Sequence, residues 1–134
     1  MSESNLILRL TASLSRTGYK VRREVPNMGQ SVDVVATKNR WITAIEAKVR
    51  DWRNALRQCV AHELVADYVC IAIGTDGVSE AFIQEAQTRG YGVIHCPAER
   101  SRCEWILRPR KNNQVWRPQR NRFTAALKAI DHEH

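Results

Sequence analysis

The sequence lacks the features that mark membrane, secreted and repetitive proteins. No apolar run approaches the roughly 20 residues that a membrane-spanning helix needs. The N-terminal stretch, residues 1–18, is interrupted by Arg9 and has an acidic start instead of a basic one, so it does not resemble a signal peptide. The sequence contains no internal repeat and no low-complexity tract. These absences favour a protein of the cytoplasm that has no membrane partner.

The cysteines show no pairing pattern. Cys59, Cys70, Cys96 and Cys103 form no C-x-x-C pair and have no recognisable disulfide spacing. Cys59 and Cys70 stand in apolar contexts, which predicts two small buried side chains. We therefore expect no disulfide framework, in keeping with a cytoplasmic protein.

Length and composition indicate a single small globular domain with a basic surface. A chain of 134 residues can form one domain with a modest core. Its 43% hydrophobic and 26% charged residues are ordinary for a globular protein and unlike a disordered one. The net charge of +7 suggests a polyanionic partner, with nucleic acid as the first candidate. The alternative is that the charge only keeps the protein in solution.

Hydrophobic periodicity predicts alternating helices and strands. Leu6, Leu10 and Leu14 share one helix face, and Gly18 follows as a stop. Residues 67–75 are continuously apolar, as in a central strand that is covered on both faces. The order α-β-β-β-α-β-α-β predicts an α/β fold with a mixed sheet flanked by helices, whose first three strands are neighbours. Helices are expected over residues 4–17, 51–65 and 79–90, and strands over 19–25, 31–37, 41–50, 67–75 and 91–97.

The composition changes after residue 98. Residues 99–134 hold nine Lys or Arg against four Asp or Glu, a net charge of +5. We therefore divide the chain into a core, residues 1–98, and a basic C-terminal extension, residues 99–134. The extension is expected to contain a strand, a turn and a short helix with Phe123, Leu127 and Ile130 on one face, and to lie on or next to the core.

Three charged residues interrupt the most apolar strands. The stretch "WITAIEAKVRDWR" (41–53) places Glu46 and Lys48 two residues apart, so both point to one side of a strand. The preceding strand carries Asp33 among valines. A buried charge is tolerable when it is paired or bound to a metal. Two explanations are open: Lys48 neutralises Glu46 or Asp33 in a structural salt bridge, or the three residues form a metal-dependent active site.

These residues carry a resemblance to a known family. With Asp33 in "SVDVVA" on the second strand and Glu46-Ala47-Lys48 in "AIEAKV" on the third, the chain resembles the PD-(D/E)xK nuclease superfamily, which has the restriction-endonuclease-like fold. The resemblance covers about residues 4–97. Gln58 stands where members similar to archaeal Holliday-junction resolvases have a glutamine, although it could also be a surface amide. The chain departs from the family pattern in having no proline before Asp33 and no secure glutamate match in the first helix.

The resemblance implies hydrolysis of DNA phosphodiester bonds with Mg²⁺ or Mn²⁺. Asp33 and Glu46 would hold the metal with the Ala47 carbonyl as a further ligand, since Mg²⁺ prefers hard oxygen ligands. Lys48 would orient the attacking water and stabilise negative charge, and Gln58 would position that water or a neighbouring ligand. We therefore expect a Mg²⁺-dependent endodeoxyribonuclease that is structure-directed or acts in repair, recombination or defence. The alternative is a non-catalytic nucleic-acid-binding module with a nuclease-like fold.

Basic residues follow the motif and recur in the extension. Arg53 and Arg57 share one helix face, which could rest on phosphates or simply be solvated. The extension interleaves Arg and Lys with Trp105 and Trp116, a mixture that suits phosphate contact and base stacking; the alternative is that both Trp residues pack on the core. Nothing resembles a separate sequence-reading domain, and cutting both strands would require a homodimer. The expected DNA contacts are Arg50, Arg53, Arg57, Arg108, Arg110, Lys111 and Arg117.

Overall fold

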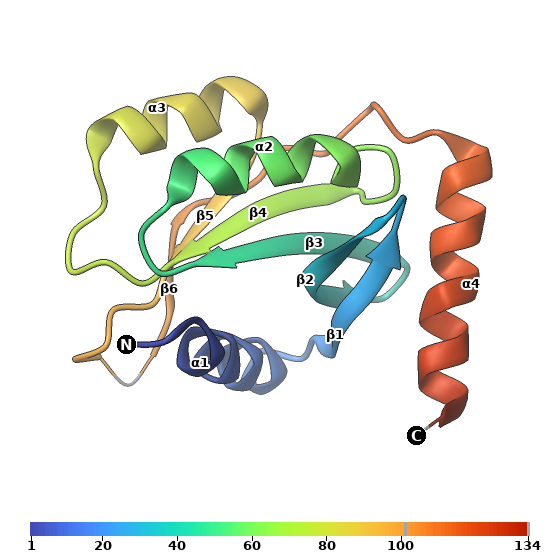
Figure 1. Cartoon of the computed structure of the whole chain (residues 1–134), viewed down its shortest axis with the longest axis horizontal. Coiled ribbons are helices and arrows are strands. Elements are labelled where there is room, and N and C mark those ends of the chain that lie inside the picture. The colour runs from blue at the N-terminus through green and yellow to red at the C-terminus, as the bar shows by residue number, and fades with distance from the viewer. Residues whose placement is uncertain (101, 134) are drawn as a thin grey trace.

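The computed structural model describes residues 1–100 and 102–133 and shows a six-stranded mixed sheet with helices on both faces (Figure 1). The strands lie side by side in sequence order. β1, β2 and β3 are antiparallel, β3, β4 and β5 are parallel, and β6 returns antiparallel to β5. The predicted mixed α/β architecture and the three neighbouring first strands are thus confirmed. The elements are α1 (Glu3–Arg16), β1 (Lys20–Asn27), β2 (Gln30–Lys38), β3 (Trp41–Lys48), α2 (Trp52–His62), β4 (Tyr68–Ile73), α3 (Glu80–Arg89), β5 (Gly92–His95), β6 (Glu104–Leu107) and α4 (Arg117–Glu133).

Capping residues set the ends of the first three helices. The side chains of Ser2, Asp51 and Ser79 each accept a backbone N–H from the first turn of α1, α2 and α3. α3 ends at Gly90, whose φ of +79° is a left-handed conformation that glycine adopts without strain. α2 ends at His62, three residues earlier than the sequence pattern predicts. Within the described residues, no helix is both long enough and apolar enough to cross a membrane.

The sheet separates two hydrophobic layers. On one face, buried residues of β3 and β4 such as Ala44 and Ile71 pack against α2, α3 and α4. On the other face, Ile45 packs against the leucine face of α1. Figure 1 shows α2 and α3 on one side of the sheet and α1 on the other. β4 is buried on both faces, as its continuous apolar sequence predicts.

The basic extension joins the sheet and the core. β6 pairs with β5 and forms one edge of the sheet. α4 lies beside β1 (Figure 1), where Lys20 and Arg22 both form ion pairs with Asp131. Phe123 and Leu127 are buried. The predicted apolar face of the terminal helix is therefore confirmed.

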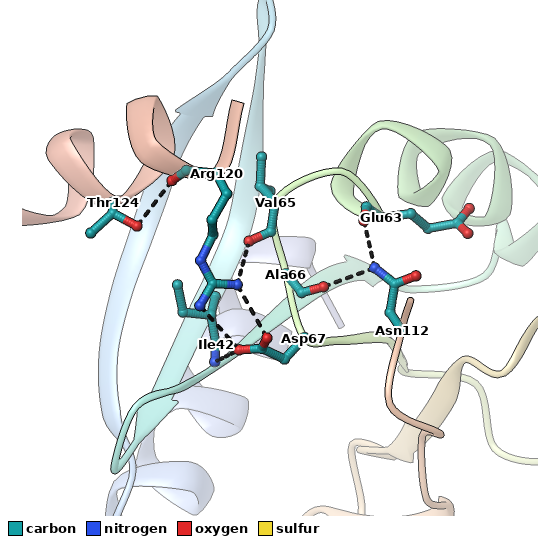
Figure 2. A network of polar contacts seen from close by, with 8 residues as sticks. All are labelled: Ile42, Glu63, Val65, Ala66, Asp67, Asn112, Arg120 and Thr124. Atoms are coloured by element: carbon teal, nitrogen blue, oxygen red, sulfur yellow. Dashed lines mark hydrogen bonds and ion pairs between the residues drawn. The ribbon is translucent and has the colours of Figure 1, made fainter. Parts of the chain in front are cut away.

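A polar network ties the extension to the loop between α2 and β4 (Figure 2). Arg120 of α4 donates to both carboxylate oxygens of Asp67, at 3.2 Å each. Asp67 also accepts the N–H of Ile42, at 2.7 Å, which fixes the start of β3. Asn112 donates to two carbonyls of the same loop at 2.5 and 2.9 Å. The extension thus holds the segment that directly follows the end of α2.

The cysteines correct one expectation from the sequence. Cys59 and Cys70 are free and buried, as predicted. Cys96 and Cys103, in contrast, form a disulfide. The antiparallel register that pairs His95 with Glu104 continues to these two cysteines, whose Cα atoms are 4.3 Å apart. Because the bond depends on this register, spacing alone could not show it, and the cysteines no longer argue for a reducing compartment.

Candidate active site

The two carboxylates that the sequence singles out meet on one face of the sheet. Backbone pairing between β2 and β3 ends at Val34 and Ile45. One residue further along this register, Asp33 and Glu46 stand opposite each other, close enough for each carboxylate to shift the pKa of the other. The Asp33 Oδ2 accepts the N–H of Ala47 at 2.9 Å. A side chain thus replaces the backbone ladder where the two strands diverge.

Both carboxylates are held in an environment that disfavours their charge. Burial raises the pKa of Asp33 to about 6, and the hydrogen-bonding contact with Glu46 adds to this shift. Burial also raises the pKa of Glu46, a residue that is only 1% exposed. The positive charge of Lys48 lowers both pKa values without cancelling either shift. Two such carboxylates in one place hold a proton or attract a cation.

Lys48 lies near the pair without closing a salt bridge. It is half-buried at the end of β3 and shares the face of Glu46. None of the ion pairs in the part of the chain that the structure describes involves Lys48. The structural salt bridge considered from the sequence is therefore not formed, and the ammonium group is available to a ligand.

His62 is a buried partner of Glu46 that the sequence analysis missed. Its Nε2 lies 2.5 Å from Glu46 Oε1, and its Nδ1 lies 3.0 Å from Nδ2 of Asn27. The same Asn27 nitrogen donates to the Ala61 carbonyl, so it is the NH₂ group that faces the ring, and Nδ1 must accept. Burial lowers the pKa of His62 to about 4. A neutral imidazole therefore donates from Nε2 to Glu46, and the contact is a hydrogen bond between a neutral ring and a carboxylate.

A weak sequence signal did mark His62. Ala55, Cys59 and His62 follow each other at i, i+4 and i+7, which puts the histidine on the face of α2 that is buried against the sheet. A polar side chain at a buried position needs a hydrogen-bond partner. The sequence could not name Glu46 as that partner, since the contact depends on how α2 crosses over β3.

Gln58 lies one turn before His62 on the same side of α2. Its Oε1 is buried and has no hydrogen-bond partner among the described residues. Four helical residues advance about 6 Å, and two strand residues advance about 6.6 Å. α2 runs antiparallel to β3, because it leads back to the start of the parallel strand β4. His62 is bonded to Glu46, so ideal helix and strand spacings put Gln58 near the level of Lys48. The surface-amide alternative thus fails for the amide oxygen, which is a buried acceptor one helical turn from His62.

The donor set suits one hard cation. Ala47 and His62 each engage one carboxylate oxygen, which leaves the second oxygen of Asp33 and of Glu46 for a ligand. The Ala47 N–H donates to Asp33, and the role of the Ala47 carbonyl as a metal ligand stays a prediction. No group of three or more His, Cys, Asp or Glu side chains in the described ranges is arranged to hold a metal ion. Mg²⁺ commonly binds through one or two carboxylates and keeps several waters, so the pair fits Mg²⁺ or Mn²⁺.

The predicted DNA contacts are exposed and come from several elements. Arg53 and Arg57 line a groove of about 580 Å³ between α2 and α3, together with Arg89. The Arg53 guanidinium lies 4.2 Å from the ring centre of Trp52. The structure therefore places two predicted contacts on the helix that also carries Gln58. The others lie elsewhere: Arg50 follows β3, while Arg108, Arg110 and Lys111 follow β6, and Arg117 begins α4.

Comparison with known proteins gives a likeness of fold. No family model and no curated protein matches the chain. One solved structure resembles it with a TM-score of 0.56, over 75% of this chain and 98% of the other, at 13% sequence identity. That neighbour is an XisH family protein from Nostoc punctiforme PCC 73102. At this identity, the likeness shows the fold alone.

Proposed function

We propose that this chain is a metal-dependent endonuclease acting on DNA, with a restriction-endonuclease-like core. The observation that carries the proposal is the juxtaposition of Asp33 and Glu46, both with raised pKa values, beside Lys48, which has no carboxylate partner among the described residues. Such a site costs folding free energy, and groups with perturbed pKa values gather at functional sites. The fold likeness is compatible with this activity but does not by itself carry it.

In this proposal each residue has a task in phosphodiester hydrolysis. A Mg²⁺ ion, when bound, would supply Lewis-acid activation of the phosphate and of the attacking water. Asp33 and Glu46 would hold the ion through their free oxygens, while the Ala47 N–H and the His62 Nε2–H fix the orientation of the carboxylates. Lys48 would stabilise the negative charge that develops on the phosphate. The buried Gln58 oxygen would accept a hydrogen bond from the attacking water.

DNA would be held by its backbone. The groove between α2 and α3 offers the guanidinium groups of Arg53 and Arg57, which contact phosphates without reading sequence, while Arg89 there pairs with Glu85. This favours a nuclease directed by DNA structure. Cutting both strands would require two copies of the chain; a strictly monomeric sedimentation profile with and without DNA would count against that step.

The test compares DNA structures, metals and variants. Labelled duplex, single-stranded, flapped and four-way-junction DNA are incubated with the protein in Mg²⁺, Mn²⁺ or EDTA. We expect metal-dependent cleavage that is lost in Asp33→Ala and in Lys48→Ala and kept in Lys128→Ala, which removes an exposed lysine of α4. Binding of Mn²⁺, measured by calorimetry, should be lost in Asp33→Ala and kept in Lys48→Ala. Cleavage that survives in both site variants would overturn the proposal.

One observation favours a second candidate, a nucleic-acid-binding module without catalysis. Glu46 is 1% exposed and already bonded to a neutral His62, so one of its oxygens is satisfied by the protein itself. This candidate predicts DNA binding without cleavage in any metal and no calorimetric binding of Mn²⁺. The same assays therefore distinguish the two candidates.

A further inference from the structure

A second cleft lies at the opposite end of β3, on the face that α1 covers. Its volume is about 260 Å³, and it is built from segments that are far apart in the sequence: the end of the α1–β1 loop, the β2–β3 hairpin, the start of β4 and the basic extension. The carboxylate pair lies on the other face of the sheet. The cleft is lined mainly by the aromatic residues Tyr19, Trp41, Tyr68 and Trp105 and the cations Lys38 and Arg108.

The aromatic rings of this cleft are accessible. Trp41 is 40% exposed at the start of β3, and its ring meets that of Tyr68 edge to face, with centroids 6.1 Å apart. Trp105 of β6 is half-buried. Indole rings left open in a concave site offer flat surfaces on which another ring can stack.

The charge around the rings is positive. The Lys38 ammonium lies 5.1 Å from the ring centre of Tyr19, and the Arg108 guanidinium lies 4.5 Å from that of Trp105. The Lys111 ammonium lies 4.7 Å from the ring centre of Trp41, which stays 40% exposed. No carboxylate lines the cleft in the described residues. The site is thus complementary to a ligand that combines an aromatic ring with an anion.

We propose that this cleft binds one unpaired nucleotide, with its base stacked against Trp41 and Trp105 and its phosphate held by Lys38 and Arg108. The volume lies below the roughly 300–1,000 Å³ of drug-sized sites, so the cleft suits a single ring system. A base inside a duplex keeps both faces stacked and cannot enter.

The cleft is independent of the proposed cleavage site. Trp41 and Thr43 alternate with Ile42 and Ala44 along β3, so they point away from the face of the carboxylates. About 17 Å of strand separates Thr43 from Lys48 at about 3.3 Å per residue. Variants of the cleft should therefore leave metal binding unchanged, and loss of cleavage activity would not remove nucleotide binding.

The binding test uses fluorescence anisotropy in EDTA with a labelled oligo(dT) of about eight nucleotides, a length within the usual range of single-strand sites. The arms are an abasic strand of the same length, a blunt duplex and free dTMP as a competitor. We expect the abasic strand to bind about 5- to 150-fold more weakly, the effect of losing one stacked base. Competition by dTMP at concentrations similar to those of unlabelled oligo(dT) would assign the cleft to free nucleotides, and competition by the oligonucleotide alone would assign it to a strand.

Matched variants locate the binding. Trp41→Ala should bring oligo(dT) affinity to the abasic level, while Leu8→Ala removes a large apolar side chain that is 56% exposed on α1, outside the cleft, and should change nothing. Arg108→Ala removes an exposed side chain. It should reduce the slope of log affinity against log salt concentration by about the amount that one phosphate contact contributes. Equal binding of abasic and base-containing strands, or wild-type affinity in both Trp41→Ala and Arg108→Ala, would overturn the proposal.

Discussion

Asp33→Asn should make the metal-free protein more stable while it destroys the metal site. The amide oxygen of the substituted side chain can still accept the Ala47 N–H, but the charge beside Glu46 is gone. The pKa of Asp33 is raised from 3.8 to about 6, so between these values the folded protein binds more protons than the unfolded chain. Stability must then fall as the pH rises through this window. The full shift corresponds to about 3 kcal/mol, and because Asp33 is partly exposed we expect a gain of about 1–2 kcal/mol above pH 6.

Urea unfolding followed by circular dichroism measures this gain. In EDTA at pH 7.5, Asp33→Asn should be the more stable protein. The difference should shrink as the pH falls from about 6 to 3.8 and vanish well below 3.8, where the wild-type carboxyl is protonated in both states. Mg²⁺ at 100 times its dissociation constant should stabilise the wild type by about 2.7 kcal/mol and the variant by much less. The order of stability should therefore reverse on adding metal. Asp76→Asn, in an exposed turn, is the charge-matched control.

Two outcomes would refute this reasoning. If Asp33→Asn is less stable than the wild type in EDTA at pH 7.5, the bond from Ala47 and its local geometry outweigh the cost of the buried charge. If Mg²⁺ stabilises both proteins equally, the ion binds elsewhere, and the carboxylate pair is not its site.

Urea unfolding also tests three further contacts. His62→Ala should cost about 2–4 kcal/mol, because it leaves a cavity and unpaired buried polar groups, and a loss below about 0.5 kcal/mol would argue against the bond to the carboxylate. Arg120→Ala should cost about 1–3 kcal/mol by removing the cation from Asp67, whereas Arg122→Ala, on the exposed side of α4, should stay within about 0.5 kcal/mol. Cys103→Ser should cost about 2–3 kcal/mol without reductant and nothing in dithiothreitol, since it opens a short disulfide loop; equal losses in both conditions would mean that the thiol position and not the bond matters.

Local periodicity was enough to predict the elements and the carboxylate pair. The spacing of Leu6, Leu10 and Leu14 predicted α1 and its buried face, and the i, i+2 relation of Glu46 and Lys48 predicted their common side. Asp33 could be placed on the strand next to that of Glu46 because consecutive short strands usually pair. These features depend on residues that are close in the sequence, so the residue pattern alone could predict them.

Features that depend on tertiary contacts could not be predicted from the sequence. The His62–Glu46 bond requires the crossover of α2, and the Cys96–Cys103 disulfide requires the pairing of β5 with β6. The basic residues were predicted as one class of DNA contact, and the fold distributes them over α2, the segments that follow β3 and β6, and the start of α4. Arg108 in the aromatic cleft illustrates this, because its partner Trp105 is near in sequence while the other rings come from distant segments.

The position of β6 has a consequence for how copies of this protein meet one another. Without β6, the sheet would end at β5, whose Gly92, Val93 and Ile94 are buried. Such a border would offer a row of unsatisfied amides and carbonyls to any other strand, which is how proteins aggregate edge to edge. β6 is only four residues long and begins with the exposed Glu104, two properties that discourage further strand addition. A chain cut after residue 98 should therefore self-associate on size-exclusion chromatography. The extension, which the sequence marks by its charge, thus protects the edge of the sheet from pairing with strands of other copies.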